Sequence, residues 1–330
     1  MTTALAILLP NWIGDAVMAT PTLRALRHGA GRGARLVGFG RRAICELLAG
    51  GAQLDKLQEL PAAGRFPLER SLRLAARLRA GRFDCAILLT NGLGVAWAAW
   101  LAGIGRRVGY ARRGRGPLLT QPLDPPRDAR GFQPISAIDY YLALASALGC
   151  PAETTEMELA TTAADEAAAD RIWAGFDLCN GRPTILLNNN TAAGTAKLWP
   201  AASMAALARR VVQALDFNVL VLAGPGEQAA ASRIVELAAI PGVIAMSAPG
   251  IGAAKACIRR ARLMVSTDSG PRHIAAAFGV PLVSLFGDTD PRWTDLHTPL
   301  DLALKASSMR ELSVDRVWSA VQRQLERLRA

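Results

Sequence analysis

The sequence predicts an α/β protein built from two Rossmann-like domains, each a parallel sheet with helices on both faces. Three observations support this prediction. The chain has 330 residues, which is more than one ordinary hydrophobic core contains. Hydrophobic residues make up 51% and charged residues 20%, a balance that excludes a disordered chain. Short apolar runs alternate with segments of helical spacing, and continuous apolar strands of this kind belong to a sheet that is buried on both faces.

The first half begins with a buried strand at Ala4–Leu9, which is followed by a helix at Asp15–Arg27. Later apolar runs in this half alternate with segments whose apolar residues have helical spacing. The further strands are expected at Arg35–Phe39, Cys85–Leu89 and Arg107–Tyr110, and the further helices at Arg41–Ala49, Phe66–Ala80, Gly94–Ala102 and Ser136–Leu148. Strands joined by helical crossovers lie parallel, so this half forms one parallel sheet.

The pattern breaks at Cys150–Glu158, where Pro, Thr and acidic residues replace the apolar run, so the domains are expected at 1–155 and 156–330. A helix at Ala163–Phe176 follows, and the alternation then restarts. The expected strands are Thr184–Asn188, Asn218–Leu222, Val243–Met246, Leu263–Ser266 and Leu282–Phe286, and the expected helices are Ala201–Ala214, Glu227–Ala239, Ala253–Arg260, one from Arg272, and Val314–Leu328. The last helix is expected to pack back across, and the default ligand site is the cleft between the domains.

The net charge of +11 comes entirely from the first half of the chain. Residues 1–150 contain 20 Lys and Arg against 9 Asp and Glu, whereas residues 151–330 contain 18 of each. Such a field attracts an anionic partner, such as an acidic membrane surface or a phosphorylated substrate. Codon usage explains the preference for Arg over Lys equally well, but it does not explain the asymmetry. Nucleic acid is not expected as the partner, because the chain has only three tyrosines and no basic stripe with interleaved aromatic residues.

Several classes of protein are excluded by what the chain lacks. No run of about 18 uncharged apolar residues occurs, so no membrane-spanning helix is expected. No basic region precedes the first apolar run, so no signal peptide is expected. The five cysteines are scattered without a CxxC pair, which indicates reduced thiols and a cytoplasmic location. The three histidines have no paired spacing, so no metal site is expected.

Two turns after strands of the first half contain candidate site residues. In the turn at residues 10–15, Gly14 allows close approach of a ligand to the backbone, and the carboxylate of Asp15 could face the cleft. Asp15 also fits the N-cap of the following helix, which is the simpler interpretation of its position alone. The turn at residues 38–43 has the GxGxxA spacing of a dinucleotide site, but it opens the second unit of the sheet and no strand ending in an acid follows. A plain turn is therefore favoured there.

Two turns in the second half contain polar residues suited to a nucleotide. Lys197 lies in a loop of small polar residues after a strand and is a point charge suited to phosphate, although a surface lysine would look the same. The loop is not a P-loop, because no GK[ST] follows its glycine. Glu227 could accept hydrogen bonds from a ribose diol, or it could stabilise the start of a helix.

A third turn, at residues 266–273, combines an acid with a helix start. Asp268 ends a strand, and the amides of Ser269 and Gly270 could bind an anion at the N-terminus of the next helix. A capped helix with a packed His273 is the simpler alternative. No G-x-S-x-G elbow surrounds Ser269, so a catalytic triad is not expected.

Four segments, in this order, resemble one family. They are LLPNWIGDAVMATPTLRALR at the N-terminus, LLTNGLGVAWAAWLAGIGRRVGYARRGRGPLLT in the middle, GTAKLWP, and STDSGPRHIAAAFGVPLVSLFGDTDP. Over nearly its whole length the chain resembles the ADP-heptose:lipopolysaccharide heptosyltransferases of glycosyltransferase family 9, most of all the heptosyltransferase II branch. The resemblance implies a GT-B fold and inverting transfer of a heptose from ADP-heptose to the inner core of lipopolysaccharide. It implies no cofactor.

The resemblance also implies a role for each matching residue. Asp15 would be the general base for the acceptor hydroxyl, Lys197 would bind phosphate, and Glu227 would reach the ribose, with Gln228 as a one-residue alternative. Asp268 would hold sugar hydroxyls, and the amides after it would bind the diphosphate. Some family members carry hydroxyl residues where this chain has Ala192 and Ala193, so Thr191 or Thr195 would substitute. The donor-binding residues implied are Gly14, Thr191, Thr195, Lys197, Glu227, Asp268, Ser269, Gly270 and His273.

The implied partners are ADP-heptose and a phosphorylated lipopolysaccharide-core glycolipid in an anionic leaflet. The arginines expected to contact this acceptor are Arg41, Arg42, Arg112, Arg113 and Arg115. The chain is expected to be a monomer, peripheral on the inner face of the cytoplasmic membrane. Two alternatives share the architecture. One is a nucleotide-sugar 2-epimerase, which would turn over the donor alone, and the other is a non-catalytic protein that binds nucleotide or anionic lipid.

Overall fold

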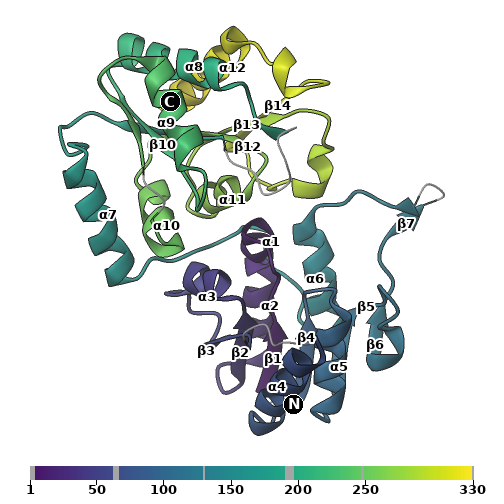
Figure 1. The fold of residues 1–330 in the computed structure, drawn as a ribbon. Coiled ribbons are helices and arrows are strands. Elements are labelled where there is room, and N and C mark those ends of the chain that lie inside the picture. The colour runs from purple at the N-terminus through teal and green to yellow at the C-terminus, as the bar shows by residue number, and fades with distance from the viewer. Residues whose placement is uncertain (1–3, 62–66, 129–130, 190–196, 247–248, 329–330) are drawn as a thin grey trace. The chain divides into compact units, whose positions relative to one another are not determined.

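The computed structural model describes residues 4–61, 67–128, 131–189, 197–246 and 249–328. The chain forms two compact units (Figure 1). Unit 1 comprises Met1–Ala160 together with Arg292–Asp295, and unit 2 comprises Thr161–Pro291 together with Leu296–Ala330. The boundary expected from the sequence lies shortly before this division.

Unit 1 contains a six-stranded parallel sheet with strand order β3-β2-β1-β4-β5-β6. The strands are β1 (Ala4–Leu8), β2 (Arg35–Gly40), β3 (Lys56–Glu59), β4 (Cys85–Leu88), β5 (Arg106–Tyr110) and β6 (Gln121–Leu123). The helices are α1 (Ile13–Met18), α2 (Thr20–Ala30), α3 (Arg42–Leu48), α4 (Pro67–Ala80), α5 (Leu93–Leu101) and α6 (Ala137–Ala147), and a short hairpin joins β7 (Arg127–Asp128) to β8 (Gly131–Phe132). The order reverses between β1 and β4, where ligands bind in open sheets of this kind.

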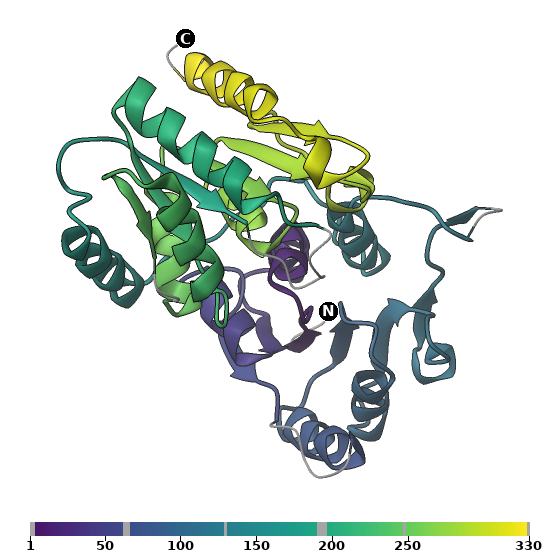
Figure 2. The same cartoon turned by 45° about the horizontal axis from the view of Figure 1, so that its top comes forward.

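Unit 2 repeats this arrangement with strand order β11-β10-β9-β12-β13-β14, also parallel (Figure 2). The strands are β9 (Thr184–Asn188), β10 (Asn218–Leu222), β11 (Val243–Ala245), β12 (Leu263–Thr267), β13 (Leu282–Phe286) and β14 (Asp301–Lys305). The helices are α7 (Ala163–Gly175), α8 (Ala201–Leu215), α9 (Gln228–Ala238), α10 (Ile251–Arg259), α11 (Gly270–Ala277) and α12 (Val314–Arg327). Helix α8 packs against α9 and α12, whereas α10 packs against α7 and α11, so two helical layers enclose the sheet.

The single helix expected at Asp15–Arg27 is two helices, because Pro21 interrupts the hydrogen-bond ladder. Pro21 has no N–H with which to reach the carbonyl of Val17. The hydroxyl of Thr20 donates to that carbonyl instead, at 2.7 Å. The chain turns at Ala19, and Asp15 therefore lies on a short helix of its own, α1.

The edge strands β3 and β6 carry no continuous apolar run, and that of β14 is only three residues long, so no strand was predicted at these positions. Strand β3 reads KLQE and has no buried residue, and β14 reads DLALK with Leu304 as its buried residue. An edge strand has a neighbour on one side only and needs less apolar surface than a central strand. Its position is decided by the neighbouring strand, which the local sequence does not reveal.

Helix α12 packs in the hydrophobic core of unit 2. Its buried residues Val317, Ala320, Val321 and Leu325 lie in the hydrophobic core of unit 2. Gln324 fixes the helix further, because its side-chain amide donates to the carbonyl of Leu282 at 3.0 Å. These contacts lie within unit 2, and the expectation that the helix packs back across stays a prediction. Among the described residues, every helix is too short or too polar to span a lipid bilayer.

Candidate functional site

Asp15 occupies the first turn of α1, directly after β1. The N-cap of α1 is Trp12, so Asp15 does not cap the helix. Its carboxylate has no hydrogen bond or ion pair with any described residue. Burial raises the pKa of Asp15 from 3.8 to about 6, because an ionised carboxylate loses hydration there. The pKa of Tyr141 on α6 is raised mainly by the burial of its own hydroxyl and, next, by the negative charge of Asp15.

A polar network lies at the carboxyl ends of β1, β4 and β5. The amide of Asn11 donates to the hydroxyl of Thr90 at 3.0 Å, and the amide of Asn91 donates to the hydroxyl of Tyr140 at 3.2 Å. Arg115 joins the network through Asn91 Oδ1, at 2.9 Å. Asn11, Thr90 and Asn91 were not predicted as site residues. The signal was present, because each follows the end of a central strand of a parallel sheet.

The prediction that Arg115 belongs to an exposed anion-binding surface is wrong. Arg115 is 0% exposed, and its guanidinium donates to the backbone carbonyls of Thr90 and Tyr110 as well as to Asn91. Burial lowers the pKa of Arg115 to about 10 and leaves it charged at neutral pH. The hydrogen bonds of the guanidinium are therefore made within unit 1, and Arg115 holds the ends of β4 and β5 in place.

The other predicted arginines are more accessible. Arg41 and Arg42 are exposed at the start of α3, and Arg42 pairs with Glu46 at 2.8 Å. Arg112 is half-buried, with its guanidinium 4.1 Å from the ring centre of Phe132. Arg113 is exposed.

The turn at residues 38–43, which has the spacing of a dinucleotide site, has a packing explanation, since a Cβ at Gly38 would meet Leu54 at 2.8 Å.

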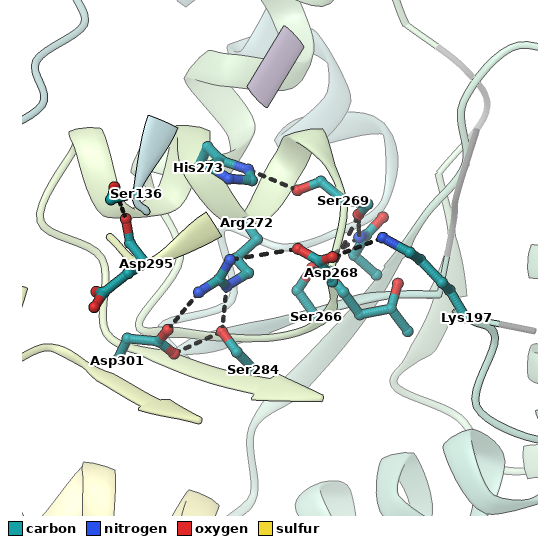
Figure 3. Close-up of polar contacts among 12 residues, drawn as sticks. Ser136, Lys197, Ser266, Asp268, Ser269, Arg272, His273, Ser284, Asp295 and Asp301 are labelled. Atoms are coloured by element: carbon teal, nitrogen blue, oxygen red, sulfur yellow. Dashed lines mark hydrogen bonds and ion pairs between the residues drawn. The ribbon is translucent and has the colours of Figure 1, made fainter. Parts of the chain in front are cut away.

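In unit 2, Asp268 lies between two cations (Figure 3). Its Oδ2 accepts a hydrogen bond from Lys197 Nζ at 2.7 Å, and its Oδ1 lies 3.5 Å from Nη1 of Arg272. Burial by itself raises the pKa of Asp268, but the hydrogen bond and charge of Lys197, with the charge of Arg272, bring the pKa below its usual value. Lys197 and Asp268, which belonged to separate candidate turns in the sequence, therefore meet at the carboxyl ends of β9 and β12. Asp268 is ionised at neutral pH.

The start of α11 is held by side chains from β9 and β12. The amide of Asn188 donates to the hydroxyls of Ser266 and Ser269, at 2.8 and 2.7 Å. Ser269 is the N-cap of α11, but its side chain forms no capping bond, and Gly270 is the first helical residue. Nδ1 of His273 lies 3.0 Å from the carbonyl of Ser269. Burial, followed by the charge of Arg272, lowers the pKa of His273 to about 4, so the imidazole is neutral at pH 7.

The remaining donor-binding candidates have separate places. Glu227 is the N-cap residue of α9, and its Oε2 accepts the backbone N–H of Gly224 at 2.8 Å. That bond stabilises the turn before α9 and leaves the other carboxylate oxygen for a ligand. Gly14 lies beside Asp15 in unit 1. Thr191 and Thr195 lie outside the described residues. Among the residues that are described, no cluster of His, Cys, Asp and Glu could hold a metal ion.

Two parallel six-stranded sheets with covering helices are the architecture of the GT-B glycosyltransferases. The profile of glycosyltransferase family 9 (heptosyltransferase) matches residues 71–316, which is most of the chain, so the chain belongs to this family of glycosyltransferases.

Three relatives illustrate the similarity. The chain is 25% identical over 297 residues to lipopolysaccharide heptosyltransferase 2 of Salmonella typhimurium, a match that covers 86% of this chain and 83% of the relative. The solved structure of E. coli ADP-heptose lps heptosyltransferase II matches with a TM-score of 0.83 at 22% identity, over 99% of this chain and 100% of that one. The glycosyl transferase family 9 structure from Veillonella parvula matches with a TM-score of 0.86 at 19% identity, over 98% and 97%. At these identities the two structures support the fold.

Proposed function

We propose that this glycosyltransferase moves a heptose from ADP-heptose to the inner core of lipopolysaccharide, with inversion at the anomeric carbon. The observation that carries the proposal is the Lys197–Asp268 pair, 2.7 Å apart at the carboxyl ends of β9 and β12, in a chain similar to named heptosyltransferases 2. Unit 2 binds the donor in this proposal. Lys197 supplies positive charge for the diphosphate, and Asp268 accepts hydrogen bonds from sugar hydroxyls.

The start of α11 supports the placing of the diphosphate. The amides at Ser269 and Gly270 open a helix whose first N–H groups have no intrahelical acceptors. Charge develops on the leaving ADP as the C1–O bond breaks, and donors already in position stabilise that charge without reorganisation. Lys197 and these amides carry out that role.

Asp15 acts as the general base in the proposal. The acceptor hydroxyl oxygen attacks C1 from the face opposite ADP, and its proton passes to the carboxylate of Asp15. A pKa of about 6 leaves this carboxylate ionised at neutral pH and makes it a stronger base than an ordinary Asp. No described cation pairs with it, so its lone pairs are available to the hydroxyl. Base catalysis of this kind contributes about 10²–10⁴-fold.

The acceptor is a phosphorylated glycolipid in this proposal, and unit 1 contacts the anionic leaflet of the cytoplasmic membrane that holds it. Exposed apolar side chains on two adjacent helices support this contact. Leu68 and Leu72 on α4 are 57% and 48% exposed, and Leu93 and Trp100 on α5 are 51% and 48% exposed. The helices pack side by side, and α4 also carries Arg70, Arg73, Arg77 and Arg79. Apolar residues flanked by arginines suit an anionic lipid surface, and this surface is called the α4–α5 face below.

The proposal is tested by the release of ADP from ADP-heptose, with and without a purified inner-core acceptor. We expect release only when both substrates are present, and Asp15→Asn should lower the rate at least a hundredfold. Asp124→Asn removes an exposed carboxylate of the same unit and serves as the matched control. Consumption of the donor without acceptor would instead indicate an epimerase or hydrolase, and absence of any turnover would indicate a binding protein.

A further inference from the structure

Arg272 is a buried cation that the proposed transfer reaction does not use directly. It is 2% exposed and lies on α11, one turn after Asp268. Its Nε donates to the hydroxyl of Ser284 on β13 at 2.7 Å, and its Nη2 pairs with Oδ2 of Asp301 on β14 at 2.9 Å. Ser284 in turn donates to Oδ1 of Asp301 at 2.6 Å. Figure 3 shows this cluster on the side of Asp268 opposite Lys197.

The two cations beside Asp268 differ in freedom. The side chain of Lys197 is 23% exposed, and its ammonium group lies at the end of a flexible four-carbon stem, so it can turn to another anion. The guanidinium of Arg272 is fixed by Ser284 and Asp301, and it also lies 4.9 Å from the ring centre of Phe286. A bound diphosphate therefore competes with Asp268 for Lys197 but leaves Arg272 in place.

If Lys197 turned to the donor diphosphate, Asp268 would lose one of the two positive charges that stabilise its ionised form. Asp268 is buried, and a buried carboxylate without a counter-charge either destabilises the protein or takes up a proton. A protonated Asp268 would lose part of its ability to accept hydrogen bonds from a sugar. The charge of Arg272, 3.5 Å from Oδ1, offsets this cost when Lys197 turns to the donor.

We propose that Arg272, held by Asp301 and Ser284, is a positioning residue that keeps Asp268 ionised and thereby releases Lys197 to the donor diphosphate. The inference rests on the proposed function, because it requires a nucleotide diphosphate at Lys197. Without Arg272, Asp268 would have Lys197 as its nearest cation and would hold it more tightly. Nucleotide binding would then weaken although no atom of Arg272 touches the nucleotide.

The chain offers a matched control for the loss of a paired arginine. Arg260 in the same unit also bridges two carboxylates, Glu166 and Asp170, each at 2.8 Å, and its guanidinium lies 5.7 Å from the ring centre of Trp173. It lies at the end of α10, outside the group formed by Lys197 and Asp268. Arg260→Met thus removes a similar set of contacts without the connection to Asp268.

The test is the affinity for ADP alone, measured by isothermal titration calorimetry on the full chain. Arg272→Met should weaken ADP binding about tenfold, which is within the range for groups coupled in one ionic network. In an Asp268→Asn background the same substitution should change ADP affinity less than twofold, because the neutral amide no longer retains Lys197. Arg260→Met should leave ADP affinity unchanged. Should Arg272→Met not fold, Arg272→Met/Asp301→Asn removes both buried charges together and should show the same loss.

Three results would contradict the proposed role of Arg272. An equal loss in both backgrounds would show that Arg272 acts only through the general integrity of unit 2 and would overturn the inference. Unchanged ADP affinity in Arg272→Met would also overturn it, while leaving the proposed function intact. Failure of the wild-type chain to bind ADP would overturn the proposed function and this inference with it.

Discussion

Replacing Asp15 by Asn should slow transfer at least a hundredfold and at the same time stabilise the protein. The pKa of Asp15 rises from 3.8 to about 6 on folding. A rise of about two pKa units corresponds to about 3 kcal/mol, because one unit is worth about 1.36 kcal/mol. An acid whose folded pKa is raised is destabilising when ionised, so the cost is fully present above about pH 6 and is lost as the pH falls toward 3.8. Asn keeps the shape of the side chain and carries no charge.

The assay is urea unfolding of wild type and Asp15→Asn at pH 8 and at pH 4, beside the rate of ADP release. At pH 8 the variant should be more stable by up to about 3 kcal/mol, and at pH 4 the difference should nearly vanish. Asp124→Asn should change neither quantity. A variant that is less stable than wild type at pH 8, or one that transfers sugar at a normal rate, would refute the reasoning.

Four further predictions concern Asp15, Lys197, Arg115 and the α4–α5 face. Because Asp15 must be ionised, kcat/KM should fall about tenfold per pH unit below pH 6, and a rate independent of pH down to pH 4 would contradict this role. Lys197→Gln should weaken ADP binding about tenfold or more in calorimetry with little effect on acceptor KM, and unchanged ADP affinity would contradict the diphosphate site. Arg115→Met should lower the free energy of unfolding by about 2–4 kcal/mol, since it leaves the buried carbonyls of Thr90 and Tyr110 without their hydrogen bonds. An unchanged free energy in urea unfolding would contradict the role of Arg115 in holding the strand ends. Leu72→Asp should reduce co-sedimentation with phosphatidylglycerol vesicles several-fold without affecting ADP binding, and undiminished sedimentation would exclude the α4–α5 face.

The central strands could be predicted because their own residues determine them. Strands β1, β9 and β12 are apolar along most of their length and buried on both faces, so the local pattern suffices. Strand β3, with the sequence KLQE, is a strand because β2 lies beside it, and nothing in these four residues alone indicates a sheet. The break after α1 was also recognisable in principle, since Pro21 lies inside the expected helix.

The site was predictable only in part, for a related reason. The turns that contain Lys197 and Asp268 follow central strands, and strand order brings such turns together at one edge of the sheet. The role of Arg272 depends on Asp301, which lies at the start of an edge strand whose apolar run is only three residues long. Arg115 looked like a surface cation because its acceptors are mostly backbone carbonyls, which no sequence pattern displays. Buried charge is therefore harder to predict than buried apolar surface.

The most direct test of the central claim is mass spectrometry of an inner-core glycolipid acceptor after incubation with the purified chain and ADP-heptose. Transfer predicts that the acceptor gains the mass of one heptosyl residue and that one ADP appears for each residue added. Asp15→Asn should form this product at least a hundredfold more slowly. An acceptor of unchanged mass beside consumed donor would contradict the assignment.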